Sequence, residues 1–234
     1  MTHNPLIVAL DLETADEARA LVDCLGAQVG FYKVGMELYT AAGMPIVNEL
    51  LDRGKDVFLD LKLYDIPETV KRAVAQVART KVRFLTVHAV GSVMRAAVEG
   101  KGPDGPQLLA VTVLTSLGPA DVAEMGYSCA ISELVAVRTR QAMEAGVQGV
   151  ITSPLEAAAV RRIVGPRAIV VTPGVRSAGS HRGDQRRVAT PAEALRAGAD
   201  YLVMGRQITR AADPASEALR VLEEIAGEVE SRPA

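Results

Sequence analysis

Eight short apolar runs, each rich in Val, Ile and Leu, recur along the chain and are separated by amphipathic stretches rich in Ala, Glu and Arg. A short and nearly continuous apolar run is typical of a strand that is buried on both faces, as strands are in a parallel sheet. The runs predict strands over residues 6–12, 30–35, 56–63, 83–89, 107–115, 149–153, 168–174 and 200–205.

Residues that begin and end helices stand between these runs. A capping-box pair, an N-cap Asp or a proline in the first turn marks a helix start, and a glycine marks an end. Such signals occur at Thr14 with Glu17, Pro45, Gly54, residues 67–69, and Asp213 with Pro214. Strand and helix therefore alternate over residues 1–234 without a linker, which predicts an α/β fold of one domain, a single (β/α)8 TIM barrel. A doubly wound open sheet is the alternative that this pattern leaves open.

The bulk properties of the chain narrow the choice of partners. Hydrophobic residues make up 49% of the 234 residues, which is enough for a sizeable core, and the formal net charge is −2. A net charge so close to zero gives no support to nucleic acid or an anionic membrane as a partner. An acidic residue interrupts the first apolar run, so no signal peptide or membrane span is expected, and Cys24 and Cys129 have no CxxC spacing. We expect a cytoplasmic protein with two reduced thiols.

Polar and charged residues gather late in the expected strands or directly after them. In a (β/α)8 barrel the active site lies at the carboxyl ends of the strands. A single residue at such a position is most simply a solvated loop residue, but a whole set is much less expected to share this placement by chance. The set consists of Asp11, Lys33, Asp60, Lys62, Asp65, His88, Thr115, Ser116, Arg176 and Arg206.

The pattern Asp-x-Lys-x-x-Asp at residues 60–65 is the centre of this set. Residues two apart on a strand project from the same face, so we expect Asp60 and Lys62 to point together into the cavity. Asp65 lies past the strand end, on a segment that can reach sideways across a subunit boundary. A surface ion pair is the alternative reading of the pattern. An Asp and a Lys inside the apolar run VFLDLKL are instead expected to be paired in a cleft and to perturb each other's pKa.

A second group of cations has the composition of a phosphate site. Gly205 and Arg206 follow the eighth run, and barrels often bind phosphate in the loops after strands seven and eight. The segment 175–187 combines arginine with glycine, which suits a mobile cationic lid over an anion. Its arginines are Arg176, Arg182, Arg186 and Arg187. A basic loop without a role is the alternative for this segment.

Other chemistries lack their sequence signals. The histidines, at positions 3, 88 and 181, are far apart, and no HExxH motif or carboxylate cluster indicates a metal site. No GxGxxG follows an expected strand and no GxSxG is present, so neither a nicotinamide cofactor nor a serine nucleophile is indicated. We expect a site with no metal and no cofactor, in which His88 is a hydrogen-bonded residue at a strand end.

Several motifs together carry a resemblance to a known family. They are Asp11, Lys33, DLKLYDIP at residues 60–67, VTVLTS at 111–116, VTPGVR at 171–176, GDQRR at 183–187 and VMGR at 203–206. In order and spacing they resemble the orotidine 5′-phosphate decarboxylase family in its short bacterial form. The resemblance runs from Asp11 to the last helix. Sister decarboxylases share the block at 60–67, whereas PGVR followed by GDQRR is more specific.

The resemblance implies that orotidine 5′-monophosphate loses CO₂ and becomes uridine 5′-monophosphate without a cofactor, in the biosynthesis of pyrimidine nucleotides. It implies that Asp60, Lys62 and the Asp65 of a neighbouring subunit form a charged array, in which Lys62 protonates C6. It further implies substrate-binding roles for Asp11 and Lys33 at the ribose, Thr69 from the partner side, Thr115 at the pyrimidine, and Arg176, Gln185, Gly205 and Arg206 at the pyrimidine and phosphate. A site shared in this way implies an obligatory homodimer.

Two other functions remain as alternatives. A sugar-phosphate decarboxylase or synthase of the same barrel family shares the 60–65 block but uses Mg²⁺, and Lys33 and the long segment 173–187 argue against it. A barrel that binds a phosphate ligand without turnover is the alternative from another class, because fold does not imply function. The intact set of Asp60, Lys62 and Asp65 argues against this second alternative.

Overall fold

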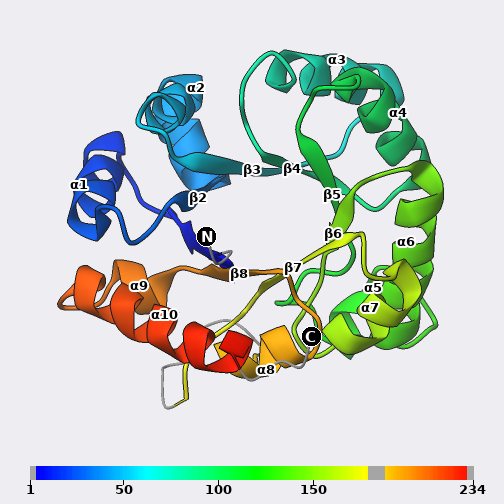
Figure 1. The fold of residues 1–234 in the computed structure, drawn as a ribbon. Coiled ribbons are helices and arrows are strands. Elements are labelled where there is room, and N and C mark those ends of the chain that lie inside the picture. Colours follow the sequence, from blue (N-terminus) through cyan, green and yellow to red (C-terminus); the bar gives the residue numbers. More distant parts are fainter. Residues whose placement is uncertain (1–3, 179–187, 231–234) are drawn as a thin grey trace.

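The protein is described by a computed structural model that covers residues 4–178 and 188–230. Eight parallel strands form a closed barrel in sequential order, and the helices lie around it (Figure 1). The prediction of a (β/α)8 barrel is confirmed, and the open sheet is excluded because β8 pairs with β1. The extent of the domain over all of residues 1–234 stays a prediction. The strands are β1 Leu6–Ala9, β2 Phe31–Gly35, β3 Asp56–Leu63, β4 Phe84–His88, β5 Gln107–Val111, β6 Gly149–Ile151, β7 Ile169–Pro173 and β8 Tyr201–Met204.

The helices follow most of the predicted starts. Thr14 and Glu17 form the predicted capping box at the start of α1, and the Asp213 side chain accepts a hydrogen bond from the backbone N–H of Ser216 as the N-cap of α10. The short helices α5 and α9 were not predicted. Within residues 4–178 and 188–230, no helix has both the length and the apolar character needed to cross a membrane. The helices are α1 Ala15–Leu25, α2 Met36–Asp52, α3 Pro67–Val77, α4 Gly91–Lys101, α5 Pro119–Glu124, α6 Ile131–Ala145, α7 Ala157–Val164, α8 Pro191–Arg196, α9 Arg206–Thr209 and α10 Pro214–Glu230.

Helix α2 differs from the prediction at its start. It begins at Met36, directly after β2, and the proline expected to open it, Pro45, lies inside it. The backbone leaves the helical region at Gly43, where φ is 62° and ψ is −156°, a conformation that glycine adopts without a steric penalty. Pro45 therefore opens the second part of a kinked helix. Gly54, with φ of 71°, follows the end of α2 as predicted.

The barrel interior is apolar at the amino ends of the strands. Phe31, Phe84 and Tyr201 are the first residues of β2, β4 and β8, and their ring centroids lie 5.1–5.7 Å apart. The Arg83 guanidinium lies over all three rings. Aromatic packing thus fills this end of the barrel. Polar side chains further along the same strands are left to form a site at the carboxyl ends.

Candidate active site

A cavity of about 470 Å³ opens at the carboxyl ends of the strands. Seven of the eight strands, or the residues directly after them, contribute to its wall, together with the starts of α2 and α9. The chain therefore reaches this cavity at the end of nearly every strand in its single circuit of the barrel. The predicted site residues in its lining are Asp11, Lys33, Asp60, Lys62, Thr115, Arg176, Gly205 and Arg206.

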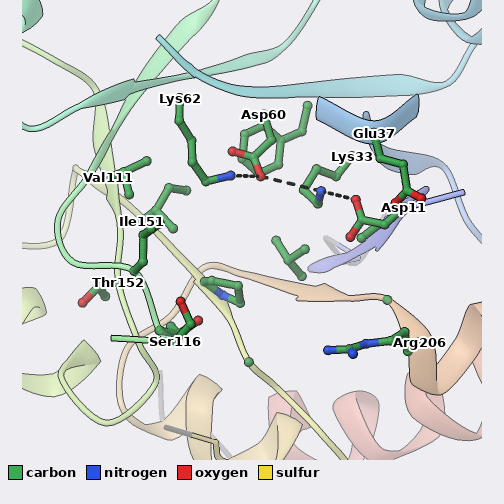
Figure 2. A pocket seen from close by; sticks show the side chains of 18 of the residues that line it. Asp11, Lys33, Glu37, Asp60, Lys62, Val111, Ser116, Ile151, Thr152 and Arg206 are labelled. Atoms are coloured by element: carbon green, nitrogen blue, oxygen red, sulfur yellow. Dashed lines mark hydrogen bonds and ion pairs between the residues drawn. The ribbon is translucent and has the colours of Figure 1, made fainter. Parts of the chain in front are cut away.

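Four charged side chains of alternating sign form a row across the cavity wall (Figure 2). The Nζ atom of Lys62 lies 2.8 Å from Oδ2 of Asp60. The Nζ atom of Lys33 lies 3.6 Å from the same oxygen and 2.7 Å from Oδ1 of Asp11. Each carboxylate thus faces a cation, as charges in a partly buried site require. Lys33, Asp60 and Lys62 lie on β2 and β3, and Asp11 follows β1, so the row comes from three neighbouring strands of the barrel.

Asp60 is the most deeply buried carboxylate of this row, with 8% of the residue exposed. Burial alone would raise its pKa, because a charged carboxylate loses hydration. The ammonium groups of Lys33 and Lys62, together with hydrogen bonds from Lys62 and Thr86, outweigh this effect and hold the pKa of Asp60 below its usual value. Asp60 is therefore ionised at neutral pH.

The backbone of β3 bulges at Lys62. Leu59 pairs with Leu85, but Leu63 pairs with Val87, so β3 uses four residues where β4 uses two. In the described part of the chain, Lys62 is the only residue other than glycine with positive φ, at 48°. This conformation costs a non-glycine residue about 1–2 kcal/mol. The prediction that Asp60 and Lys62 point into one cavity is correct, but their approach depends on this bulge as well as on strand alternation.

Gly35 leaves the space in which the row assembles. It ends β2 and lies opposite Asp60 in the register of β2 and β3. A Cβ atom on Gly35 would come 2.7 Å from Nζ of Lys33 and 2.9 Å from Oδ1 of Asp11. Any side chain at this position would therefore push the two charged groups of that ion pair out of place.

Two arginines enter the cavity from the ends of β7 and β8. Arg176 and Arg206 both line it, and Figure 2 shows Arg206 apart from the row of Lys62, Asp60 and Lys33. Burial lowers the pKa of Arg176, and the nearby positive charge of Arg206 lowers it further. Two guanidinium groups that repel each other at the edge of a cavity favour the binding of an anion between or beside them.

A hydrogen-bond network holds the chain segments that carry these two arginines. The Ser177 N–H donates to Oε1 of Gln207 at 3.0 Å, and Nε2 of Gln207 donates to the Ser177 hydroxyl at 2.9 Å. Ser177 also donates to Glu224 on α10 at 2.7 Å. Ser177 follows Arg176 and Gln207 follows Arg206, so these bonds fix the segment after β7 to the start of α9. They thereby set the distance between the two chain segments that carry the arginines.

Comparison with known proteins agrees with this geometry. Residues 4–221 match the model of the orotidine 5′-phosphate decarboxylase / HUMPS family. The chain belongs to this family. It is 52% identical over 221 residues to an orotidine 5′-phosphate decarboxylase of Rhodopseudomonas palustris (strain HaA2), covering 94% of each chain. It is 53% identical over 228 residues to that of Caulobacter sp. (strain K31), covering 97% of this chain and 100% of the relative.

A solved structure from the same family has the same fold. The crystal structure of orotidine 5′-phosphate decarboxylase from Lactobacillus acidophilus superimposes with a TM-score of 0.83 at 35% sequence identity, over 95% of this chain and 99% of that one. The family resemblance seen in the sequence motifs is therefore confirmed along nearly the whole chain.

The structure brings most of the predicted site residues of this decarboxylase family member to one cavity, but not all. Asp65 and Thr69 are exposed and do not line the cavity of their own chain. Asp65 lies on the segment between β3 and α3, where its Oδ1 accepts a hydrogen bond from the Ile66 N–H at 2.6 Å. Gln185, with Arg182, Arg186 and Arg187, lies outside the described residues.

Three residues near the site escaped the sequence analysis. Glu37 and Arg210 line the cavity from α2 and from the end of α9, where no strand-end rule directs attention to them. Thr86 is fully buried on β4, and its hydroxyl bonds both Asp60 and Lys62. A lone threonine inside an apolar strand carries no recognisable signal. Only the alternation of β4, which turns residues 84, 86 and 88 to the barrel interior, could have indicated it.

His88 lies at the end of β4, as predicted, and its ring packs 5.3 Å from the ring of Tyr64. Partial burial lowers its pKa, and the positive charges of Arg138 and Lys62 lower it further. His88 is therefore neutral at pH 7. Among the residues that the structure describes, no group of three or more His, Cys, Asp or Glu side chains could hold a metal ion.

Proposed function

We propose that this chain converts orotidine 5′-monophosphate to uridine 5′-monophosphate and CO₂, in the biosynthesis of pyrimidine nucleotides and without a cofactor. The observation that carries the proposal is the Lys62 ammonium, 2.8 Å from the buried Asp60 carboxylate, in the wall of a cavity that also holds Arg176 and Arg206. The names of the relatives agree with this reaction.

The charged row supplies what the reaction needs. When the bond between C6 and the carboxylate breaks, CO₂ leaves and the electron pair stays on C6, where no neighbouring group delocalises it well. In the proposed mechanism the Lys62 ammonium stabilises this pair electrostatically and then transfers a proton from Nζ to C6. Solvent returns the proton to Lys62 after the product leaves. Asp60, and the Asp65 that a partner subunit is proposed to supply, hold the Lys62 ammonium in position for this transfer.

The substrate is proposed to lie across the cavity, with its phosphate at Arg206 and Arg176 and its base at Lys62. Asp11 and Lys33 would hold the ribose hydroxyls, Thr115 the pyrimidine, and Gln185 with Gly205 would complete the contacts to the base and phosphate. Binding energy from the phosphate is available far from C6 and can be used to organise the charged row.

The apolar wall beside Lys62 fits this orientation. Val111 and Ile151 line the cavity near Lys62 (Figure 2). A low-polarity surface there strengthens the electrostatic interactions of the ammonium, because it excludes water from the reacting bond.

We also propose a homodimer in which Asp65 and Thr69 reach the cavity of the partner. Both residues are exposed and lie outside the cavity lining of their own chain. Asp65 is flanked by Tyr64 and Ile66, each 66% exposed, and Met36 after β2 is 61% exposed. Large apolar side chains gathered at one end of a barrel are typical of a protein–protein interface, and a symmetric pair would bury them.

The Mg²⁺-dependent sugar-phosphate alternative finds no support in the relatives, which are named orotidine 5′-phosphate decarboxylases. The donor set also fits it poorly. Lys33 lies between the carboxylates of Asp11 and Asp60, 2.7 Å from one and 3.6 Å from the other. Its ammonium group occupies the position from which a cation would have to bridge them.

A cytoplasmic location is proposed on chemical grounds. Cys24 and Cys129 are not paired in a disulfide, and unpaired thiols persist in a reducing compartment. Nucleotides are also made and used there, so the proposed substrate and the thiols point to the same place.

The test of the proposed function is the loss of the orotate absorbance when purified protein is mixed with orotidine 5′-monophosphate, with and without EDTA. We expect turnover that EDTA leaves unchanged. If a folded protein leaves the orotate absorbance unchanged, the proposed function is contradicted, and turnover of a sugar phosphate with added Mg²⁺ would then favour the sugar-phosphate class. Tight nucleotide binding without turnover would favour a barrel that binds a phosphate ligand without catalysis.

A further inference from the structure

We propose that Thr86 is a positioning residue for this reaction, whose hydroxyl group fixes the Asp60 carboxylate and the Lys62 backbone relative to each other. This inference rests on the proposed function and extends it to a residue on a different strand, β4. Thr86 is not part of the cavity lining, so its effect on the reaction would pass through the two charged residues that it bonds.

The first bond holds the bulge. Because β3 uses four residues where β4 uses two, the regular hydrogen bonding between these strands is interrupted between Leu59 and Leu63. The Lys62 N–H donates instead to Oγ1 of Thr86 at 2.9 Å. This bond satisfies a backbone donor that the bulge would otherwise leave without a partner and supports the left-handed conformation of Lys62, with φ of 48°.

The second bond holds the carboxylate. The Thr86 hydroxyl donates its single hydrogen to Oδ1 of Asp60 at 2.9 Å, while Oδ2 of Asp60 accepts a hydrogen bond from Nζ of Lys62 at 2.8 Å. The two oxygens of Asp60 are therefore bound from opposite sides. Without the Thr86 bond, Asp60 could rotate about its terminal torsion, which has a broad and shallow preference.

The two bonds close a ring. It runs from the Lys62 N–H to Thr86, from Thr86 to Asp60, and from Asp60 back to the Lys62 ammonium. One hydroxyl thus orients both the start of the lysine side chain and the group that binds its end. Thr86 is fully buried, so water is not available to replace the hydroxyl in either bond.

The experiment compares Thr86→Val with Thr86→Ser in the decarboxylation assay. Valine has nearly the same shape but lacks the hydroxyl, whereas serine keeps it. Thr139→Val is the matched control, because Thr139 is equally buried on α6 and its hydroxyl bonds only the backbone carbonyl of Val135 among the described contacts. All variants are first compared in thermal unfolding, and kcat and KM are then measured separately.

We expect Thr86→Val to lower kcat by about 10- to 100-fold with KM within about threefold, because a misplaced catalytic group slows the chemical step more than it weakens binding. Thr86→Ser should keep kcat within about threefold of the wild-type value. Thr139→Val should also keep kcat within that range. If Thr86→Val does not fold, Thr86→Ala replaces it under the same criteria.

The inference fails if the wild type is active and the folded Thr86→Val protein keeps its kcat, if Thr86→Ser is as impaired as Thr86→Val, or if Thr139→Val is impaired to the same degree. An inactive wild type would instead contradict the proposed function itself, so the two failures are distinguishable.

Discussion

A Cβ atom on Gly35 would lie 2.7 Å from the Nζ atom of Lys33, which is closer than such atoms approach in folded proteins. Gly35 has no positive φ, so its backbone would accept another residue. The absence of a side chain matters here because the charged row passes directly over it. The backbone conformation at Gly35 would permit another residue, but the position of the Lys33 ammonium requires that no side chain be present there.

We expect Gly35→Ala to fold and to lower kcat/KM by about tenfold, because its methyl group displaces the ion pair of Lys33 and Asp11. The matched control is Gly30→Ala, at a position just before the same strand where a Cβ atom would meet nothing within 4 Å. Steady-state kinetics of both variants provide the measurement. Equal kinetics for the two variants would show that the row tolerates the methyl group.

Arg206→Ala is expected to separate phosphate binding from the chemistry at C6. It should lower kcat/KM for orotidine 5′-monophosphate by about 10- to 150-fold, because this is the effect of losing one hydrogen bond to a charged group. Turnover of phosphate-free orotidine should hardly change. Arg140→Ala, an equal change of charge at an exposed position on α6, is the control. An equal loss with both substrates would contradict the role of Arg206 at the phosphate.

The shared active site can be tested by mixing two inactive variants. Lys62→Ala lacks the lysine in its own cavity, and Asp65→Asn lacks the carboxylate that it would lend to its partner. A hybrid dimer would then contain one intact site, and equal mixing should restore about a quarter of the wild-type activity. If Asp65 acts within its own chain, the hybrid has no intact site and the mixture stays inactive.

His88 predicts a measurable dependence of stability on pH. Its pKa is lowered from 6.5 in the folded protein, so the unfolded chain binds a proton at a higher pH than the folded one. The contribution of neutral His88 to the free energy of unfolding is therefore complete above pH 6.5. It should be lost as the pH falls below that value. Urea unfolding at several pH values should show a shallower fall for His88→Gln, whereas parallel curves would contradict the lowered pKa.

The sequence predicted the barrel and the gathering of most candidate residues at one cavity because both follow from simple periodicities. Apolar runs at regular intervals predicted all eight strands, and the rule that barrel sites lie at the carboxyl ends of strands pointed to Asp11, Lys33 and Asp60. The two-residue alternation of β3 predicted that Lys62 points with Asp60. These expectations follow from patterns among neighbouring residues, although the final approach of Lys62 to Asp60 also depends on the bulge.

Other features depend on contacts that no local pattern encodes. The bulge at Lys62 is defined by the register between β3 and β4, and its support by Thr86 crosses 24 residues of sequence. The proline signal at Pro45 marked only the second part of α2, whereas the helix begins at Met36 and is kinked at Gly43. The role of Asp65 requires a second chain, and Gln185 lies outside the described residues, so both stay predictions.

The most direct test of the central claim is the fate of the proton at C6. Wild-type protein and Lys62→Ala should be incubated with orotidine 5′-monophosphate in D₂O containing EDTA, and the uridine 5′-monophosphate analysed by NMR and mass spectrometry. We expect the wild type to release one CO₂ for each uridine 5′-monophosphate that carries deuterium at C6, and the variant to form no detectable product. A folded wild-type protein that leaves the substrate unchanged, or a Lys62→Ala variant that turns over at the wild-type rate, would contradict the assignment of Lys62 as the proton donor of a decarboxylase.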